Sequence, residues 1–348
     1  MTNIFMGIAF HAIGGIAAAT CFLPQKGTPN WTHQSYWLIF CLSAWIILPI
    51  TVAFYTVPNL LEVLAQAPLS AMFKATWMGA LYGFGGMAFG VAIRYIGFSL
   101  TYSIAIGISA VLGTVIPSAI AGTLISSFSS DGGLIVLAGF ITSTIGVIFC
   151  GKAGILKENE IEHADSKFDM KKGLLLACFA GALSAVFSMA LAAGKPIDDI
   201  AASYGATNFK GNATYIFAMA GAFITNLVWW SVVHFKQNTW REYAKVPETE
   251  EHPKKQSLGK YFFFAILSGV LWYGQFFFYG LGHVRMGNFE FISWGIHMAM
   301  LIFFSFGVGW LLKEWKGYSA ATLNTLYFGL AALLLSFCII SYGSWMGS

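Results

Sequence analysis

Long runs of apolar residues, separated by short polar breaks, are the feature that most constrains how this chain can fold. A helix needs about 20 apolar residues to cross a bilayer, and by that rule the sequence predicts ten spans. Only 10% of the residues are charged, against about 25% in a soluble domain, so a water-soluble fold lacks sufficient polar surface. We therefore predict an all-α membrane protein with ten transmembrane helices. The predicted spans are 3–23, 35–57, 71–93, 98–122, 132–152, 173–194, 213–235, 259–281, 290–312 and 319–345.

Residues within and before these spans refine the prediction. No Lys or Arg precedes the first run, and its length exceeds that of a signal-peptide core, so we expect it to remain a spanning helix. Pro49 and Pro117 lie inside spans and predict kinks or unwound turns. The cysteines show no metal-type spacing, and we expect them to be small apolar fillers. They are Cys21, Cys41, Cys150, Cys178 and Cys338.

The basic residues are distributed very unevenly between the two sides of the predicted membrane. Loops after spans 1, 3, 5, 7 and 9 hold 15 of the 19 Lys and Arg residues. The other side, with both termini, holds Lys74, Lys195, Lys210 and Arg285. Because basic loops stay in the cytoplasm, we predict that both termini lie outside.

An internal repeat divides the chain into two halves. A shift of 190 residues places Gly79, Gly90 and Gly97 on Gly269, Gly280 and Gly287, and Tyr82 on Trp272. Five spans in each half give the halves opposite orientations, which is typical of transporters with a midplane substrate site. We predict two inverted five-helix repeats, 1–152 and 173–348, joined by a charged cytoplasmic linker at 153–172.

Aromatic side chains are concentrated between residues 269 and 297. Trp272, Tyr273, Gln275, Tyr279 and Trp294 bring rings and one carboxamide into a short hairpin. Rings pack on the C–H face of a sugar while an amide bonds its hydroxyls, so we predict a substrate-binding wall. Helix packing is the alternative, because aromatics and glycines are also common between transmembrane helices.

Few ionisable groups lie inside the spans, and each is a candidate because burying charge in hydrocarbon is costly. His11 and His297 are candidates to bind substrate, and His297 also to couple protons; a neutral histidine bonded to backbone is the alternative. Glu290 is predicted to begin helix 9, on the same face as His297, and to couple protons. Capping that helix is its other possible role.

Two further polar residues belong to the predicted site. Lys195 ends helix 6 and either snorkels into water or pairs with a carboxylate at the outer entrance. Asn226 lies deep in helix 7 and either joins helices or binds a polyol.

Motifs for other chemistries are missing from the sequence. There is no Walker motif, no HExxH and no acidic cluster within a span, so we predict no metal, no cofactor, no catalytic residues and no nucleic-acid partner. The GFGG segment at 83–86 lies within a span, where phosphate cradling is not expected. Glycines of helices 1 and 3 are instead predicted to form close packing faces. They are Gly7, Gly14, Gly15, Gly83, Gly86 and Gly90.

Several segments carry a family pattern. They are LWYGQFFFYGLGH at 271–283, FISWGIHM at 291–298, LLKEW at 311–315, AWIILP at 44–49, RYIGFS at 94–99, IAIGI at 104–108 and KP at 195–196. With them the chain resembles the L-rhamnose–proton symporter family of the drug/metabolite transporter superfamily. The resemblance implies a ten-helix carrier of the bacterial inner membrane that imports L-rhamnose with a proton. All the site residues named above stand in matching stretches.

Two other functions were weighed against sugar–proton symport. A metabolite or drug exporter of the same superfamily has the same architecture, but polar groups among the aromatics favour a sugar over a lipophilic drug. A membrane-embedded enzyme acting on a lipid-linked sugar needs clustered carboxylates or histidines near an interface. Only Asp198, Asp199 and Glu290 come close to that, so we do not expect an enzyme.

Overall fold

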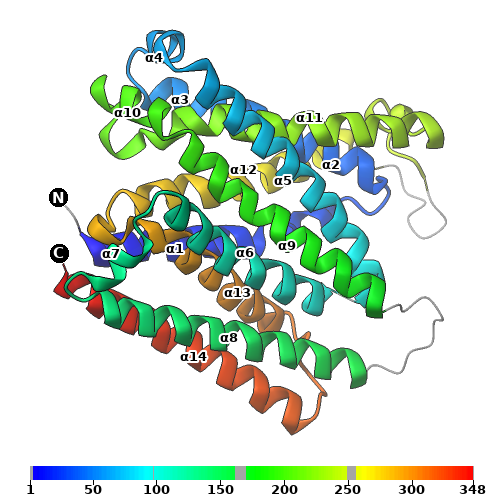
Figure 1. The fold of residues 1–348 in the computed structure, drawn as a ribbon. Helices are drawn as coiled ribbons and strands as arrows, with labels where there is room; N and C mark the ends of the chain where they lie inside the picture. The colour runs from blue at the N-terminus through cyan, green and yellow to red at the C-terminus, as the bar shows by residue number, and fades with distance from the viewer. Residues whose placement is uncertain (1–2, 97, 161–169, 249–255, 348) are drawn as a thin grey trace.

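A computed structural model describes residues 3–96, 98–160, 170–248 and 256–347, and these residues are almost entirely helical (Figure 1). Within these ranges, ten segments are long and apolar enough to cross a membrane, as predicted. Nine are built on the long helices α1 (Ile4–Thr20), α5 (Leu69–Ile96), α6 (Phe98–Ile120), α8 (Gly133–Glu160), α9 (Met170–Ala193), α11 (Gly211–Gln237), α12 (Leu258–His283), α13 (Ser293–Leu311) and α14 (Ala320–Met346).

The second span is divided into three pieces at its proline. These are α2 (His33–Leu42), the π-helix η2 (Ser43–Ile47) and α3 (Leu48–Thr56). Pro49 is the second residue of α3 and directly follows the π-helical turn, a helix irregularity of the kind found where a residue lacks its N–H. The irregularity expected at Pro49 is therefore confirmed. Pro117 differs, because α6 stays helical through it to Ile120.

Short elements connect the spans. They are η1 (Leu23–Gly27), α4 (Leu60–Gln66), α7 (Leu124–Ser129), α10 (Lys195–Ser203), η3 (Thr207–Phe209), η4 (Trp240–Tyr243) and η5 (Gly287–Ile292). Helix α8 runs to Glu160 and α9 begins at Met170, so helix covers both ends of the predicted linker. Its central part, 161–169, lies outside the described residues.

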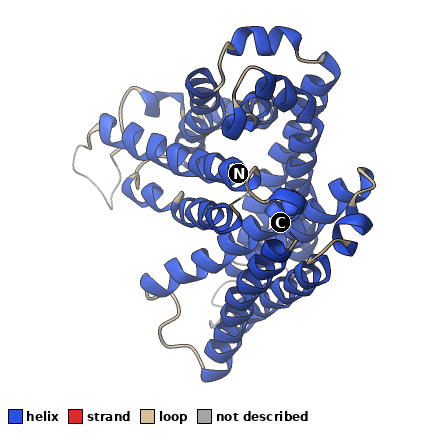
Figure 2. Cartoon of the chain, turned by 90° about the vertical axis from the view of Figure 1, so that its left-hand side faces the viewer, coloured by secondary structure: helices blue, strands red, loops and turns tan. Residues whose placement is uncertain are grey.

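Both termini, α7 and α10 lie at one end of the helix bundle, which we call the terminal end (Figure 1). Viewed from that end, the long helices surround the marked termini on several sides (Figure 2). The opposite end, which we call the loop end, carries the segments 21–32 and 238–247. These two segments are in hydrogen-bonding contact, because the Trp31 indole donates to the Glu242 carbonyl at 3.2 Å.

Helix α1 packs between α12 and α13, whereas α9 packs between α5 and α6. Helices α8 and α14 pack mainly on each other and lie beside the rest of the bundle (Figure 1). The core between the two halves is largely aromatic and includes Phe40, Trp45, Phe187, Trp272 and Trp294.

Glycines bring several helix backbones into contact. A Cβ added to Gly7 would lie 3.1 Å from the Gly282 carbonyl oxygen, and one added to Gly15 would lie 3.1 Å from Met300. Gly83 faces Ala222 in the same way. Because a side chain at these crossings would force the facing helix to shift, the packing role predicted for the glycines of α1 and for Gly83 is confirmed. It is wrong for Gly86 and Gly90, since no atom of the described residues lies within 4 Å of a Cβ added there.

The cysteines are all free. Three of them, Cys21, Cys41 and Cys150, are buried as expected of apolar fillers, and Cys178 is partly buried. Cys338 departs from that expectation, because its side chain is exposed.

Candidate functional site

One face of α12 forms the centre of the site. Trp272, Gln275, Phe276 and Tyr279 follow a three- and four-residue spacing, which places them on a single side of a helix. All four are buried. His283 continues this face into the last turn of α12.

A polar cavity of about 400 Å³ lies beside this face at the terminal end. Its wall comes from the ends of α6 and α9, from α7, α10, α12 and η5, and from the start of α11. Its ionisable lining residues are Lys195, Asp198, Lys210, His283 and Glu290. Both signs of charge are present, so the cavity suits a polar solute without strongly selecting an ion.

Glu290 lies at this cavity, near the start of the ninth span, Gly287–Leu311. It belongs to η5, a 3-10 turn that leads directly into α13 at Ser293. The backbone is non-helical at Phe289, one residue before Glu290. The expectation that Glu290 lies at the start of helix 9 is therefore confirmed to within one turn. Its carboxylate faces His283, with Oε2 4.0 Å from Nε2.

The other polar residues of this cavity have defined surroundings. Asp198 accepts a hydrogen bond from the Thr214 hydroxyl at 2.6 Å, which ties α10 to α11. Lys195 lines the cavity with an exposed side chain. Within the described part of the chain, no carboxylate lies within ion-pair distance of its ammonium.

A second cavity of about 130 Å³ lies deeper, among aromatic rings. Trp272, Gln275 and Trp294, all predicted from the sequence, line it. Phe276, within the predicted aromatic stretch 269–297, lines it too. The sequence reasoning missed its remaining aromatic lining, which comprises Phe22, Trp37, Phe40, Trp45, Tyr82, Phe89 and Tyr102. The repeat contained the signal for Tyr82, because the 190-residue shift places it on Trp272 and both line this cavity.

Trp294 borders both cavities. Its indole N–H donates to the Ser109 carbonyl at 3.0 Å, and this bond holds the ring in place. Gly113 leaves the room for it, since an added Cβ there would lie 2.4 Å from the indole nitrogen. The indole is therefore held in a defined position in the wall that the two cavities share.

Four predicted substrate-binding residues do not line either cavity. Tyr273 points away from the binding face and packs edge-on against Tyr215 at 6.4 Å. His11 and His297 are fully buried behind Tyr279 and contact each other. Asn226 of α11 accepts hydrogen bonds from Trp37 of α2 at 3.0 Å and from Trp230 at 3.3 Å. Its side chain thus joins two helices, which was the alternative to sugar binding.

A larger cavity of about 550 Å³ lies on the flank of the molecule between α6 and α8. Its lining is apolar except for Ser103, Ser143, Thr144 and Lys152 at its edges. It offers few partners for sugar hydroxyls, so its size does not make it the site.

The loop end is closed by hydrogen bonds between two loops. Glu242 is buried, and its carboxylate accepts from the Thr32 backbone N–H at 2.9 Å and hydroxyl at 3.0 Å. Gln34 donates to the Gln237 side-chain oxygen at 2.8 Å. Together these bonds fasten the start of α2 to η4 and the end of α11.

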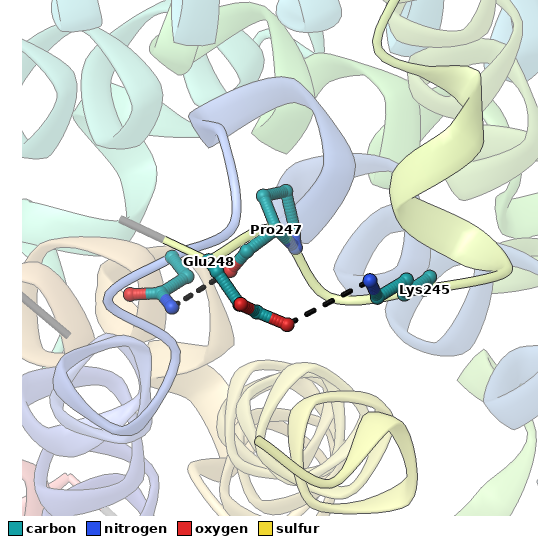
Figure 3. A network of polar contacts seen from close by, with 4 residues as sticks. Lys245, Pro247 and Glu248 are labelled. Atoms are coloured by element: carbon teal, nitrogen blue, oxygen red, sulfur yellow. Dashed lines mark hydrogen bonds and ion pairs between the residues drawn. The ribbon is translucent and has the colours of Figure 1, made fainter. Parts of the chain in front are cut away.

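Further contacts extend this closure. The Asn30 amide donates to the Pro247 carbonyl oxygen at 2.8 Å, next to an ion pair of 3.6 Å between Lys245 and Glu248 (Figure 3). The ion pair is exposed, so it adds little stability. Asn30 is buried, and its bond joins the two loops directly.

No group of three or more metal-ligating side chains occurs within the described ranges. The site consists of rings, amides, hydroxyls and a few charged groups around two cavities that share Trp294 in their walls. With ten spanning helices, such a site defines a membrane protein of the secondary-transporter class.

Comparisons with known proteins give the particular family. The model of the L-rhamnose-proton symport protein family matches residues 1–346, and the chain belongs to this family. It is 32% identical to an L-rhamnose-proton symporter of Pectobacterium atrosepticum over 99% of both chains. It is 31% identical to one of Yersinia pestis over 98% of both chains. The family consists of transporters, so the enzyme alternative is set aside.

Proposed function

We propose that this protein imports L-rhamnose, or a closely related deoxyhexose, together with a proton by alternating access. The observation that carries the proposal is Trp294 at the junction of a polar and an aromatic cavity. A deoxyhexose has hydroxyls that need polar partners, and a methyl and C–H face that pack on rings. Both kinds of surface meet at Trp294. Membership in the symporter family over nearly the whole chain supports the same function.

The sugar-binding residues in this proposal are those at the cavities. Trp272, Gln275, Tyr279 and Trp294 contact the sugar, and Lys195 lies at the entrance. Tyr273, Asn226, His11 and His297 remain sequence-based predictions for sugar contact. Any such contact requires a conformation in which α12, α11, α1 or α13 has rotated.

Two inverted repeats underlie the transport cycle in this proposal. Helix α1 of the first half packs on α12 and α13 of the second half, and α9 of the second half packs on α5 and α6 of the first. This reciprocal packing is expected if the two halves are equivalent. Rocking of one half against the other then exposes the cavities to each side in turn. The uneven distribution of basic residues supports an inner-membrane protein with both termini in the periplasm, so the terminal-end cavity faces outside.

The proton supplies the driving force. Its entry provides about 2.3 kcal/mol per 100 mV of membrane potential, enough for roughly a 50-fold sugar gradient. No resident cofactor is needed. Coupling requires a group whose protonation changes sugar affinity in one state more than in the other. Glu290 and His297 are the sequence-based candidates.

Uptake of labelled L-rhamnose into proteoliposomes tests the function. An inward proton gradient should drive accumulation above the external concentration, and a protonophore should abolish it. Accumulation that survives the protonophore would refute proton symport. Expulsion of tetraphenylphosphonium without any L-rhamnose uptake would favour the exporter alternative.

The Glu290→Gln variant tests coupling by that residue. We expect it to exchange L-rhamnose across the membrane but to lose proton-driven accumulation, because glutamine keeps the shape and cannot bind a proton. Glu248→Gln, in the exposed ion pair at the loop end, is the matched control and should accumulate sugar like the wild type. Normal accumulation by Glu290→Gln would remove Glu290 from the mechanism.

A further inference from the structure

Two buried histidines from opposite ends of the sequence contact each other inside the bundle. His11 of α1 and His297 of α13 are both 0% exposed, with ring centroids 5.9 Å apart. Among the described residues, none of their four ring nitrogens has a hydrogen-bond partner. A neutral imidazole carries one donor and one acceptor, and burying these unpaired is unfavourable. An arrangement that leaves four such atoms unpaired calls for a functional reason.

Glycines on the neighbouring helices make room for both rings. A Cβ added to Gly14 of α1 would lie 3.0 Å from the His297 ring, and one added to Gly282 of α12 would lie 2.9 Å from the His11 ring. Each imidazole therefore occupies space that any side chain at these two positions would fill. The chain accommodates the pair at the crossing of α1, α12 and α13.

Aromatic contacts connect the pair to the polar cavity. The Tyr279 ring lies 5.5 Å from His11 and 5.4 Å from His297, centroid to centroid. On its other side it stacks on His283 at 5.6 Å, and His283 faces Glu290. The pair is thus separated from the cavity by a single aromatic ring, and it does not contact the space available to the sugar.

Few charged groups surround the pair. Helix α12 presents Tyr279 and His283, and Glu290 follows in η5. Arg285 lies between His283 and Glu290 in the sequence, and its guanidinium lies over the Phe10 ring, 4.9 Å from the ring centroid. The other helices that pack on α1 or α13 contribute four more titratable residues. Tyr102 of α6 is hydrogen-bonded to Ser305, and Lys152 of α8 is exposed. Tyr327 and Tyr342 of α14 are both about half exposed. No carboxylate forms an ion pair with His11 or His297 in the described part of the chain.

We propose that His11 and His297 form one proton-binding site, which holds the coupling proton between two imidazole rings behind the sugar cavities. The proton adds to the lone pair of one ring nitrogen, and the other ring accepts the resulting N–H directly or through one water. The proton leaves from the same nitrogen when the protein adopts the conformation open to the other side of the membrane. The pair takes one proton, because a second would place two positive charges at close range.

This inference rests on the proposed function, since the proton it describes is the symported one. It also changes the role predicted for His11 from sugar contact to proton binding. A charge held between α1 and α13 favours whichever conformation solvates or compensates it better. Because α1 packs on both α12 and α13, a shift of α1 would move the wall that carries Trp272 and Tyr279.

Titration of the histidine rings tests the pair in the intact protein. Full-length protein with ¹⁵N-labelled histidine would be studied by NMR in lipid nanodiscs, with signals assigned from His11→Gln and His297→Gln. We expect both rings to respond at one common midpoint, and removal of either to shift the midpoint of the other. Independent midpoints, unchanged by loss of the partner, would refute a shared site.

Transport by the same variants gives a second test. Proton-driven L-rhamnose accumulation should fall to the equilibrium level in His11→Gln, in His297→Gln and, to the same extent, in the double variant. His234→Gln is the control, because His234 is also buried but bonds Thr239 and Tyr243 at the loop end, and it should accumulate sugar. Wild-type accumulation by His11→Gln would overturn the proposal.

Downhill L-rhamnose entry, measured on the same variants, distinguishes a loss of proton coupling from a loss of helix packing. Loss of accumulation with less loss of downhill entry supports the pair, whereas a parallel loss of both indicates a packing role and contradicts it. A wild-type protein that carries no L-rhamnose at all would refute the proposed function. The NMR titration would still decide whether the two rings share a proton.

Discussion

Trp294 is the residue on which the geometry of the site most depends. Its ring separates the polar cavity from the aromatic one, and its hydrogen bond to the Ser109 carbonyl joins α13 to α6. Gly113 on α6 provides the space for the indole. One side chain thus links α13 to α6 and lines both cavities.

The Trp294→Phe substitution should weaken L-rhamnose binding by about 10-fold. It removes a buried hydrogen bond worth about 1 kcal/mol and reduces the ring area available to the sugar. Isothermal titration calorimetry on the purified protein measures the change. Trp310→Phe, on the same helix but 59% exposed, is the matched control and should bind like the wild type. Equal affinity of both variants would place the sugar elsewhere.

Gly282 is a second residue whose environment permits no substitution. An alanine Cβ there would lie 2.8 Å from the Gly7 carbonyl oxygen and 2.9 Å from the His11 ring. We expect Gly282→Ala to destabilise the protein by about 1–3 kcal/mol through overpacking. Thermal unfolding in detergent, followed by tryptophan fluorescence, reports the loss.

The control for Gly282 is another helical glycine with open surroundings. Gly90 of α5 is exposed, and no atom in the described part of the chain lies within 4 Å of a Cβ added there, so Gly90→Ala should leave the unfolding temperature unchanged or raise it slightly. A Gly282→Ala protein as stable as Gly90→Ala would show that α1 and α12 can separate without loss.

At the level of elements, the paired helices α8 and α14 are joined at the loop end by a cap. The Glu160 carboxylate of α8 accepts hydrogen bonds from the Ser319 backbone N–H at 2.7 Å, the Ser319 hydroxyl at 2.6 Å and the Thr322 hydroxyl. Ser319 precedes α14, so a side chain of one helix caps the start of the other. These bonds hold the pKa of Glu160 below its ordinary value of 4.5.

This cap predicts a pH-dependent stability difference. A lowered pKa in the folded state means that the carboxylate stabilises fully above the ordinary value of 4.5 and loses its effect as pH falls through the lowered one. Glu160→Gln should therefore unfold at a lower temperature than the wild type at pH 7. This difference in unfolding temperature should shrink only when the pH falls below the ordinary pKa of 4.5. Unfolding curves at a series of pH values test it, and a difference that is constant with pH would contradict it.

At the scale of the whole molecule, the two ends are in different states. The terminal end has an open polar cavity, whereas buried Glu242 and the Gln34–Gln237 bond close the loop end. Alternating access requires these loop-end contacts to break whenever the sugar leaves on that side.

A reducible cross-link across the loop end should therefore stop transport. Gln34→Cys with Gln237→Cys, joined by a short disulfide-containing bis-maleimide in a Cys338→Ser background, should bind L-rhamnose but not carry it. Reduction should restore transport, which separates locking from damage. Undiminished flux through the cross-linked protein would show that the loop end need not open.

The sequence by itself determined the elements of this fold and its family. Span number and position follow from local hydropathy, because a helix in lipid must satisfy its own backbone hydrogen bonds wherever it lies. The glycines of α1 marked close crossings, and the aromatic hairpin at 269–297 marked the wall that carries Trp272, Gln275, Tyr279 and Trp294. These are local properties, so the sequence contains them directly.

Only the tertiary structure decided which side chains meet. In a membrane both the lipid and the protein interior are apolar, so periodicity does not show which way a helix face turns. Helical spacing places Trp272 and Tyr273 on different faces of α12, but only the packing shows that the face of Trp272 lines the cavity. The Glu290 carboxylate of η5 faces His283 of α12, a contact between two elements that the sequence pattern does not show. The contact between His11 and His297 exists only because α1 packs between α12 and α13, an arrangement set by long-range packing.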